Sequence, residues 1–399
     1  MIMETCYWKL QNNEADLKAY EAAAQLVQAG EVVAFPTETV YGLGADGLNG
    51  EAVKKIFAAK GRPNDNPLIL HISSLEEIAP LTTGLNANAK ALAEAFWPGP
   101  LTLIVKKSAI IPDEVTAGLD TVAIRFPENL EAQAFIRACG RPIAAPSANL
   151  SGRPSPTNAQ DVLEDMKGKI AGLLDGGSCT IGLESTIVDT TEAVPVILRP
   201  GGITYEMLTQ VLGTVEIDKA LLDSENLKPK APGMKYRHYA PKAKMYLVEG
   251  DDSATYAALC AYAAANAKLK VGFLCSKLGE ERLMGALGTI FLYCRLSGDT
   301  KQEAADILKE RIKVCVWGDS CAELSEKLFY YLRDFDRYEP DVIIAEGVNE
   351  DGLGLAIMNR MRKAAGYQEI VGAMGASVSE TSSSLFTMKN GKELPEFLR

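Results

Sequence analysis

The first 215 residues alternate between two patterns of hydrophobic and polar positions. Apolar side chains recur every three to four residues in some segments, which predicts helices, and form short apolar runs in others, which predicts strands. We expect helices at Glu14–Ala29, Glu51–Ala59, Ala87–Phe96, Leu130–Cys139, Ala159–Met166 and Tyr205–Leu212. We expect strands at Val32–Phe35, Leu68–Ile72, Leu101–Val105, Thr121–Phe126, Ile143–Ala145, Leu173–Asp175, Ser185–Asp189 and Pro195–Leu198. This mixture indicates an α/β domain over residues 1–215.

A stretch without a clear period, residues 216–243, follows and contains Pro229, Pro232 and Pro241, which is typical of a linker. A second α/β pattern covers residues 244–372, and strands separated by helices predict a small parallel sheet. Its strands are expected at Met245–Val248, Val271–Cys275, Ile290–Cys294 and Val342–Ala345, and its helices at Ala254–Ala265, 301–313, 322–335 and Leu355–Ala364. The polar residues 373–399 predict a mobile tail.

The composition is that of a soluble globular protein. The chain has 399 residues, of which 47% are hydrophobic and 23% charged, so two or three domains are expected. It has no apolar run of about 18 residues and no signal-peptide pattern at its start. Its eight cysteines form no C-x-x-C pair, which favours buried, reduced thiols over a zinc or redox site. We therefore expect a cytoplasmic protein.

Charge and histidine content narrow the possible functions. Residues 1–215 carry 16 Lys and Arg against 25 Asp and Glu, and the whole chain has a net charge of -11. A protein without bulk positive charge is poorly suited to hold nucleic acid by counterion release. The chain has only two histidines, His71 and His238, which excludes a His-rich metal site. A role in RNA biology would therefore act through a small molecule or a partner.

Residues Gly42–Gly47 match the pattern G-x-G-x-x-G, which alone is a weak signal. The dinucleotide fingerprint places these glycines directly between a strand and a helix, whereas here Pro36 to Gly42 intervene after the strand. We favour a Gly-rich turn that orients Thr37–Tyr41. No G-x-x-x-x-G-K-[ST] sequence is present, which excludes a P-loop of that type.

Several cations stand in stiff loops rich in Gly and Pro. These are Lys60, Arg62, Arg125, Arg153 and Arg199. Fixing a side chain in such a stiff loop costs less conformational entropy than in a flexible one. Several cations that come together would suit a polyanion such as a triphosphate. Ser147 could serve as a nucleophile, but no G-x-S-x-G elbow surrounds it, so we prefer a hydrogen-bonding role.

Taken in order, these motifs resemble the YrdC-type threonylcarbamoyl-AMP synthase family, in its longer two-domain form. The segments that carry the resemblance are Pro36–Gly44, Lys60–Pro63, Asn66–Leu68, Trp97–Thr102, Thr121–Arg125, Ala145–Asn149, Glu184–Ile187, Leu198–Gly201, Ala231–Pro241 and Gly352–Arg360. The resemblance implies a YrdC-like twisted, mixed, open sheet with helices, followed by a smaller Rossmann-like α/β/α domain.

The resemblance also implies a nucleotidyltransferase that makes threonylcarbamoyl-AMP and pyrophosphate from L-threonine, bicarbonate or CO2, and ATP with Mg²⁺. By matching motif positions, Lys60 and Arg62 are expected to stabilise charge during catalysis. Contacts with ATP are expected from Arg62, Asn66, Thr121, Ser147, Ser155, Arg199 and Tyr236. Contacts with threonine are expected from Thr39, His71, Arg125, Ala145 and Ser185. Glu38 and Glu184 are either structural or ligands of magnesium. No residue is assigned as a metal ligand from the sequence, which does not decide between these two roles.

Partners follow from the same resemblance. The product would pass to a separate complex that transfers the threonylcarbamoyl group to tRNA, with weak or indirect tRNA contact by this chain. The linker around Tyr236 is either a lid over the nucleotide or a plain spacer. The second domain is expected to regulate catalysis or to support that lid.

Two other classes of protein remain open at this point. One is a module that binds double-stranded RNA or the ribosome, against which the acidic first half argues. The other is a carbamoyl-transfer relative of the same fold, which would carry C-x-x-C zinc fingers that this sequence lacks.

Overall fold

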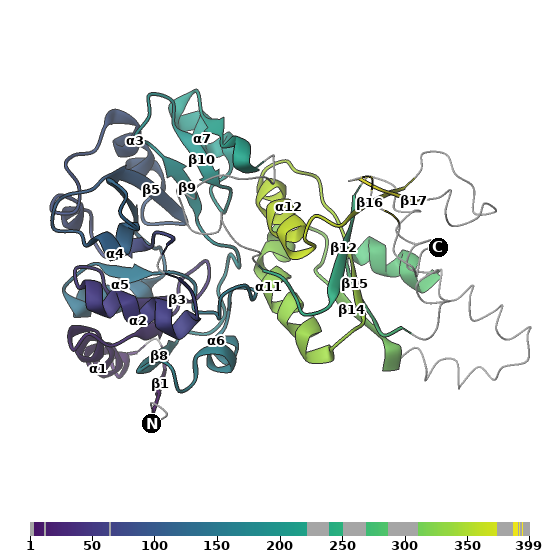
Figure 1. Ribbon diagram of the computed structural model, residues 1–399, viewed down its shortest axis with the longest axis horizontal. Helices are drawn as coiled ribbons and strands as arrows, with labels where there is room; N and C mark the ends of the chain where they lie inside the picture. The colour runs from purple at the N-terminus through teal and green to yellow at the C-terminus, as the bar shows by residue number, and fades with distance from the viewer. Residues whose placement is uncertain are drawn as a thin grey trace, which may run out of the picture. The chain divides into compact units, whose positions relative to one another are not determined.

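The chain forms two compact units, Met1–Tyr236 and Arg237–Arg399, in the computed structural model (Figure 1). The structure describes residues 4–11, 13–63, 65–221, 239–249, 269–285, 310–372, 386–389, 391 and 393. No helix among these residues has the length and apolar character needed to cross a membrane.

One large mixed sheet organises the first unit. Its strands lie in the order β1-β8-β2-β3-β7-β4-β6-β5-β9-β10-β11. In this order their bounds are Cys6–Lys9, Gly172–Asp175, Val33–Phe35, Gly42–Asp46, Ile143–Ala145, Ile69–His71, Thr121–Arg125, Leu101–Lys106, Thr186–Asp189, Val196–Arg199 and Glu216–Ile217. The sheet contains parallel pairs such as β4–β6 and antiparallel pairs such as β5–β6. Neighbours in the sheet are often distant in the sequence, so this order depends on tertiary packing.

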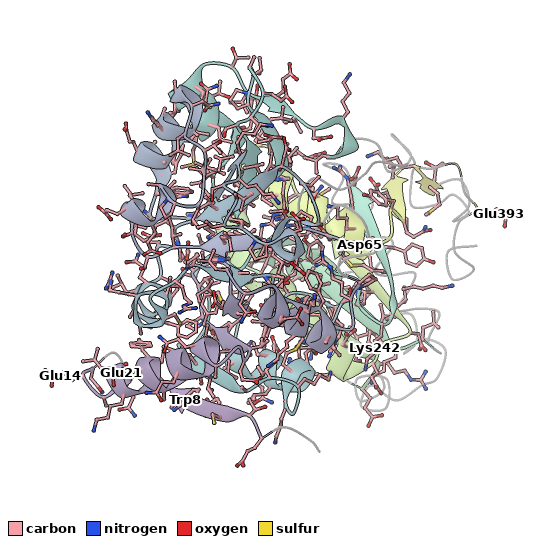
Figure 2. The ribbon with its side chains drawn as sticks, turned by 60° about the vertical axis from the view of Figure 1, so that its left-hand side comes forward. Trp8, Glu14, Glu21, Asp65, Lys242 and Glu393 are labelled. Carbon is pink, nitrogen blue, oxygen red and sulfur yellow. The ribbon has the colours of Figure 1, made fainter. Side chains whose placement is uncertain are left out.

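Helices cover both faces of this sheet (Figure 1). They are α1 (Asp16–Gln28), α2 (Gly50–Lys60), α3 (Ala87–Phe96), α4 (Asp113–Thr116), α5 (Leu130–Cys139), α6 (Ala159–Met166) and α7 (Tyr205–Leu212), with short 3-10 turns η1 (Leu75–Ile78) and η2 (Lys219–Leu221). Helices α1 and α5 share one apolar cluster with β2 and β7. Glu21 points outward from α1 in Figure 2, whereas Ala23 and Val27 of the same helix are buried.

Capping residues set the first and last residues of several helices, which the spacing of hydrophobic residues alone does not determine. The Asn49 side chain accepts hydrogen bonds from the backbone N–H groups of Glu51 and Ala52, which starts α2. Gly61 ends this helix in the left-handed conformation, with φ of 62°. Asn129 caps α5 in the same way as Asn49 caps α2. The predicted bounds of α3, α5, α6 and α7 agree with the observed ones.

The prediction of a Gly-rich turn at Gly42–Gly47 is wrong for most of its length, because Gly42–Asp46 is the buried strand β3. A Cβ added to Gly42 would lie 2.8 Å from the Phe35 ring, and one added to Gly44 would lie 2.8 Å from Ile143 Cγ2. The glycines therefore allow β2 and β7 to pack tightly on both sides of β3.

The predicted linker, residues 216–243, includes residues at both ends that belong to the folded units. Glu216–Ile217 form β11, which pairs with β10 in the first unit. At the other end the Tyr239 ring stacks on Phe329, with ring centroids 5.0 Å apart, in the second unit. Residues 222–238 lie outside the described residues.

The second unit contains a mostly parallel sheet in the order β14-β13-β15-β12-β16-β17. In this order the strands span Ile312–Val316, Val271–Cys275, Val342–Glu346, Lys244–Glu249, Glu369–Gly372 and Phe386–Met388. Its helices include α11 (Cys321–Tyr338), which begins at a capping box formed by Ser320 and Glu323, and α12 (Leu353–Ala364). The predicted elements at Ala254–Ala265 and Ile290–Cys294 lie outside the described residues.

Two predictions for the second unit are corrected. The helix expected over 301–313 does not include residues 312 and 313, which belong to strand β14, and residues 301–309 are outside the described part. The segment 373–399 was expected to be a mobile tail, yet Phe386–Met388 pair antiparallel with β16. A strand partner at a sheet edge thus orders part of a polar sequence that carries little signal of its own.

Candidate functional site

A row of polar side chains crosses one face of the first sheet. His71 on β4 and Thr102 on β5 are both register partners of Arg125 on β6, so the three side chains share a face. One step along these strands, the same face carries a small apolar cluster that includes Ile69, Ala123 and Ile104. The other face belongs to the main core. The polar row is therefore set into an otherwise apolar surface.

Arg125 is the central cation of this row and is only 3% exposed. Its Nη1 donates a hydrogen bond to Thr39 Oγ1 at 2.8 Å, and its Nη2 forms an ion pair with Glu38 Oε1 at 2.7 Å. Its buried Nε makes no hydrogen bond with any residue that the structure describes. A buried guanidinium with a donor to spare is suited to a carboxylate, which accepts hydrogen bonds from two donors at once.

Glu38 supports Arg125 rather than facing an open site. Its carboxylate oxygens also accept hydrogen bonds from the backbone N–H groups of Glu128 and Asn129, at the start of α5, at 3.1 and 3.4 Å. These contacts place the carboxylate between a cation and a helix N-terminus. Of the two interpretations offered by the sequence, the structural one therefore has the direct support.

His71 lies at the end of β4 and is buried as a neutral imidazole. Burial, and after it the positive charge of Arg125, lowers the pKa of His71 to about 3. The charge of Arg199 acts in the same direction, so both arginines lie near this ring. The Nδ1 atom is 3.2 Å from the carbonyl oxygen of Ile69, and the ring meets Phe35 edge-on. His71 can therefore exchange hydrogen bonds with a ligand but holds no proton to release near neutral pH.

Ser185 and Arg199 extend the row beyond Thr102. Arg199 Nε donates to the carbonyl oxygen of Ser185 at 2.9 Å, and its Nη2 donates to Ser185 Oγ at 3.1 Å. Ser185 Oγ is also 2.7 Å from Thr102 Oγ1. Arg199 was predicted to contact ATP and Ser185 to contact threonine, and the structure places the two side chains in direct contact.

Lys60 and Ser147 form a second group near the end of α2. Lys60 Nζ donates to the carbonyl oxygens of Ser147 and Asn149, at 2.5 and 2.7 Å. The Ser147 hydroxyl donates to Asn149 Oδ1 at 2.5 Å. An amide oxygen is no general base, so this arrangement favours the hydrogen-bonding role of Ser147 over the nucleophilic one. Asn149, which the sequence reasoning did not single out, links the two.

The remaining predicted ATP contacts are spread over three places. Arg62 Nη2 donates to the carbonyl oxygen of Asn66 at 3.4 Å. Ser155 Oγ donates to Glu184 Oε1 at 2.7 Å, next to Ser185 in the chain. Thr121 begins β6, four residues from Arg125 and hence roughly 13 Å away along the strand. Tyr236 lies outside the described residues.

Two other predicted residues have plain structural settings. Ala145 ends β7, is buried, and is the register partner of Ile69. Arg153 forms an ion pair with the buried Asp165, whose other oxygen accepts a hydrogen bond from the Leu150 N–H at 3.0 Å. Arg153 therefore fixes the loop after Asn149 and does not lie in the row with Arg125. Thr102 is the site residue that sequence reasoning most clearly missed, because its place opposite Arg125 depends on the register between β5 and β6.

The fold and this site define an α/β protein whose first unit carries a row of buried polar side chains, centred on Arg125, on one face of an open mixed sheet. Family models cover both units: residues 25–201 match the Sua5_yciO_yrdC model, described as "Telomere recombination", and residues 203–366 match "Threonylcarbamoyl-AMP synthase, C-terminal domain". The chain belongs to the threonylcarbamoyl-AMP synthase family.

Relatives and solved structures match nearly the whole chain. A threonylcarbamoyl-AMP synthase of Pyrococcus abyssi is 47% identical over 349 residues, which are 87% of this chain and 94% of that protein. The Bacillus subtilis enzyme of the same name is 46% identical over 87% of this chain and 93% of its own length. The crystal structure of P. abyssi Sua5 complexed with L-threonine matches with a TM-score of 0.79 and 44% identity, over 93% of this chain and 99% of that one. The predicted fold class is confirmed.

Proposed function

We propose that this chain catalyses the synthesis of threonylcarbamoyl-AMP from L-threonine, bicarbonate or CO2, and ATP, with release of pyrophosphate. The names of the relatives that match it over almost their full length support this reaction. The chain is then an enzyme of the nucleotidyltransferase type. Its product serves the threonylcarbamoyl modification of adenosine in tRNA.

The buried fork of Arg125 is the observation that carries this proposal. An amino acid offers one carboxylate, and Arg125 offers an Nε–H that makes no hydrogen bond among the described residues, while Thr39 and Glu38 hold its other nitrogens. The related P. abyssi protein has been crystallised with L-threonine, which is the ligand that we assign to this place here. His71, Ser185 and the end of β7 at Ala145 would complete the threonine site.

The reaction needs positioning and charge neutralisation rather than a covalent intermediate on the protein. The amine of threonine adds to CO2 to form a carbamate, and a carbamate oxygen then attacks the α-phosphorus of ATP. The new P–O bond replaces the bond to the leaving pyrophosphate, which takes the electron pair. Aligned reactants and nearby cations lower the barrier of such a step. We assign the ATP contacts to Arg62, Asn66, Thr121, Ser147, Ser155, Arg199 and Tyr236.

Lys60 contributes to this step by holding the loop that presents Ser147. Its ammonium group donates hydrogen bonds to two main-chain carbonyl oxygens of that loop, which satisfies the charge of this buried lysine. Lys60 therefore acts on ATP through the loop's position, and Arg62 is the cation that we place at the phosphates.

Magnesium is proposed to enter with ATP. Mg²⁺ keeps several waters and is bound mainly by phosphates with one or two carboxylates. Among the described residues no group of three Asp, Glu, His or Cys side chains gathers, and Glu38 is committed to Arg125. This donor set fits a metal carried by the triphosphate, and Glu184, which accepts a hydrogen bond from Ser155, is the carboxylate that we place nearest to it. When bound, the ion would neutralise charge on the phosphates.

Partners and compartment belong to the same proposal. We infer a separate transferase that consumes the threonylcarbamoyl-AMP, with weak or indirect contact between this chain and tRNA. A cytoplasmic location is supported by the thiols, because the six cysteines of the described part are free. Burial raises the pKa of Cys139 and Cys315 to about 12, which keeps both thiols protonated and unreactive.

The decisive assay measures pyrophosphate release by the full chain. Release should require ATP, threonine and bicarbonate together, and the product should have the mass of threonylcarbamoyl-AMP. Pyrophosphate release that continues without threonine, or without bicarbonate, would refute the assignment. Filter binding to RNA at physiological salt should give weak retention compared with a basic control protein.

A further inference from the structure

The hydroxyl groups of Thr102 and Ser185 have two protons, and one of them has no acceptor among the described residues. Both residues are buried, with exposed fractions of 0% and 1%, and their oxygens lie 2.7 Å apart. A hydroxyl carries one proton and two lone pairs. The bond between the two oxygens consumes a single proton, and whichever hydroxyl donates, the proton of the other remains to be placed.

The hydrogen bond from Arg199 indicates which hydroxyl of this pair donates to the other. A guanidinium can only donate, so its hydrogen bond fills one lone pair of Ser185 Oγ. Thr102 Oγ1 has no other hydrogen-bond partner within the described part of the chain, so Ser185 Oγ is the acceptor available to its proton. With Thr102 as donor, Ser185 Oγ accepts twice, and its own proton points away from both partners. The spare donor then belongs to Ser185.

A second spare donor, Arg125 Nε, belongs to the strand on the other side of Thr102. Thr102 is the register partner of Arg125 on the neighbouring antiparallel strand, which places their Cα atoms about 5 Å apart. Arg125 Nε is buried and makes no hydrogen bond within the described residues. Buried donors without acceptors are costly, and two of them that flank Thr102 match the two oxygens of one carboxylate.

We infer that Thr102 is a positioning residue of this site. Its hydroxyl turns the Ser185 proton toward the carboxylate that Arg125 also binds, and so sets the orientation of the amino acid before its amine is carbamoylated. This inference rests on the proposed function, since it names threonine as the ligand. Thr102 itself touches Ser185 and need not touch the substrate.

The test compares Thr102→Val, which keeps the shape and removes the hydroxyl, with Thr102→Ser, which restores it. Thr190→Val is the matched control, because the Thr190 hydroxyl is equally buried but donates to the carbonyl oxygen of Ile104 at 2.8 Å. We expect Thr102→Val to raise the dissociation constant for L-threonine about tenfold or more. Thr102→Ser should stay within about threefold of wild type, and the affinity for ATP should not change.

L-threoninol, in which a CH2OH group replaces the carboxylate, separates the proposed role from a general packing effect. Its inhibition constant should be the same for wild type and Thr102→Val, because threoninol lacks the carboxylate to which Ser185 is proposed to donate. Equal weakening of threonine and threoninol would overturn the inference, as would a Thr102→Val protein that binds threonine like Thr190→Val. If Thr102→Val does not fold, Thr102→Ala against Thr102→Ser gives the same comparison.

The same measurements keep the two proposals apart. A wild-type protein that binds threonine but releases no pyrophosphate in the presence of bicarbonate and ATP would refute the proposed function alone. A wild-type protein that completes the reaction while Thr102→Val retains full threonine affinity would refute only the role of Thr102.

Discussion

The ammonium group of Lys60 lies 2.7 Å from the main-chain carbonyl oxygen of Asn149, so the last residue of α2 holds a loop 89 positions away in the sequence. Main-chain carbonyls, unlike a phosphate, are present in every state of the enzyme. Lys60 therefore links the stability of the first unit to the shape of the Ser147–Asn149 loop, where we propose that ATP binds.

Replacing Lys60 with Met should loosen this loop. We expect a loss of about 2 kcal/mol in the free energy of unfolding, because the two carbonyl oxygens lose a charged donor. The KM for ATP should rise severalfold, while the affinity for threonine changes little. Urea denaturation and initial rates measure both effects. Lys54→Met, on the exposed side of the same helix, is the control and should leave the KM for ATP as it is. An unchanged KM for ATP in the Lys60 variant would argue against loop positioning.

The variant Arg125→Lys should damage threonine binding selectively. Lysine keeps the charge but cannot offer two donors in a fixed plane, so the KM for threonine should rise about thirtyfold, equivalent to about 2 kcal/mol. The KM for ATP should change less than threefold. The control is Arg141→Lys, since Arg141 pairs with Asp46 but is 44% exposed. Parallel increases in both KM values would show that the substitution disturbs the whole site instead.

The neutral state of His71 predicts how stability depends on pH. The folded pKa of His71 is lowered to about 3, below the unfolded value near 6.5, so the unfolded state binds the proton more readily. Stability from this residue is complete above pH 6.5 and falls as the pH drops toward the folded pKa. At pH 5 the loss is about 2 kcal/mol. The measurement is the difference in unfolding free energy between pH 7 and pH 5.

His71→Gln provides the comparison for this pH effect, because glutamine keeps a polar side chain and does not titrate. The variant should lose less stability than wild type between pH 7 and pH 5, by about the same 2 kcal/mol. Matching pH profiles for the two proteins would mean that His71 is protonated in the folded state, contrary to its burial beside Arg125.

Much of the fold could be predicted because local signals agree with the final structure. The predicted helix Ala87–Phe96 has the observed bounds, since Asn86 caps its start and an apolar face runs along its length. Strand β3 could not be recognised in this way. Its sequence, Gly42–Asp46, lacks the β-branched and aromatic residues that favour strands, and its form depends on Phe35 and Ile143 on the neighbouring strands.

The site shows the same division between local and tertiary information. The resemblance supplied the types and positions of residues such as Arg125 and Arg199. It did not supply their partners, because the contacts of Arg125 with Glu38 and of Arg199 with Ser185 depend on strand order and register. Thr102 went unnoticed for this reason: its importance lies in standing opposite Arg125, which no spacing along the chain reveals.

The packing of β3 leads to a last prediction, that Gly44→Ala destabilises the first unit. The added methyl group would lie 2.8 Å from Ile143 Cγ2 and 2.9 Å from Phe35 Cε1, well inside van der Waals contact. Overpacking of this kind costs about 1–3 kcal/mol, measured as a lower urea midpoint. Gly285→Ala is the control, because no described residue beyond its own helix and chain neighbours has an atom within 4 Å of the added Cβ. If Gly44→Ala were as stable as that control, the glycines of β3 would have to be explained by something other than close contact, and the turn first expected from the sequence would regain support.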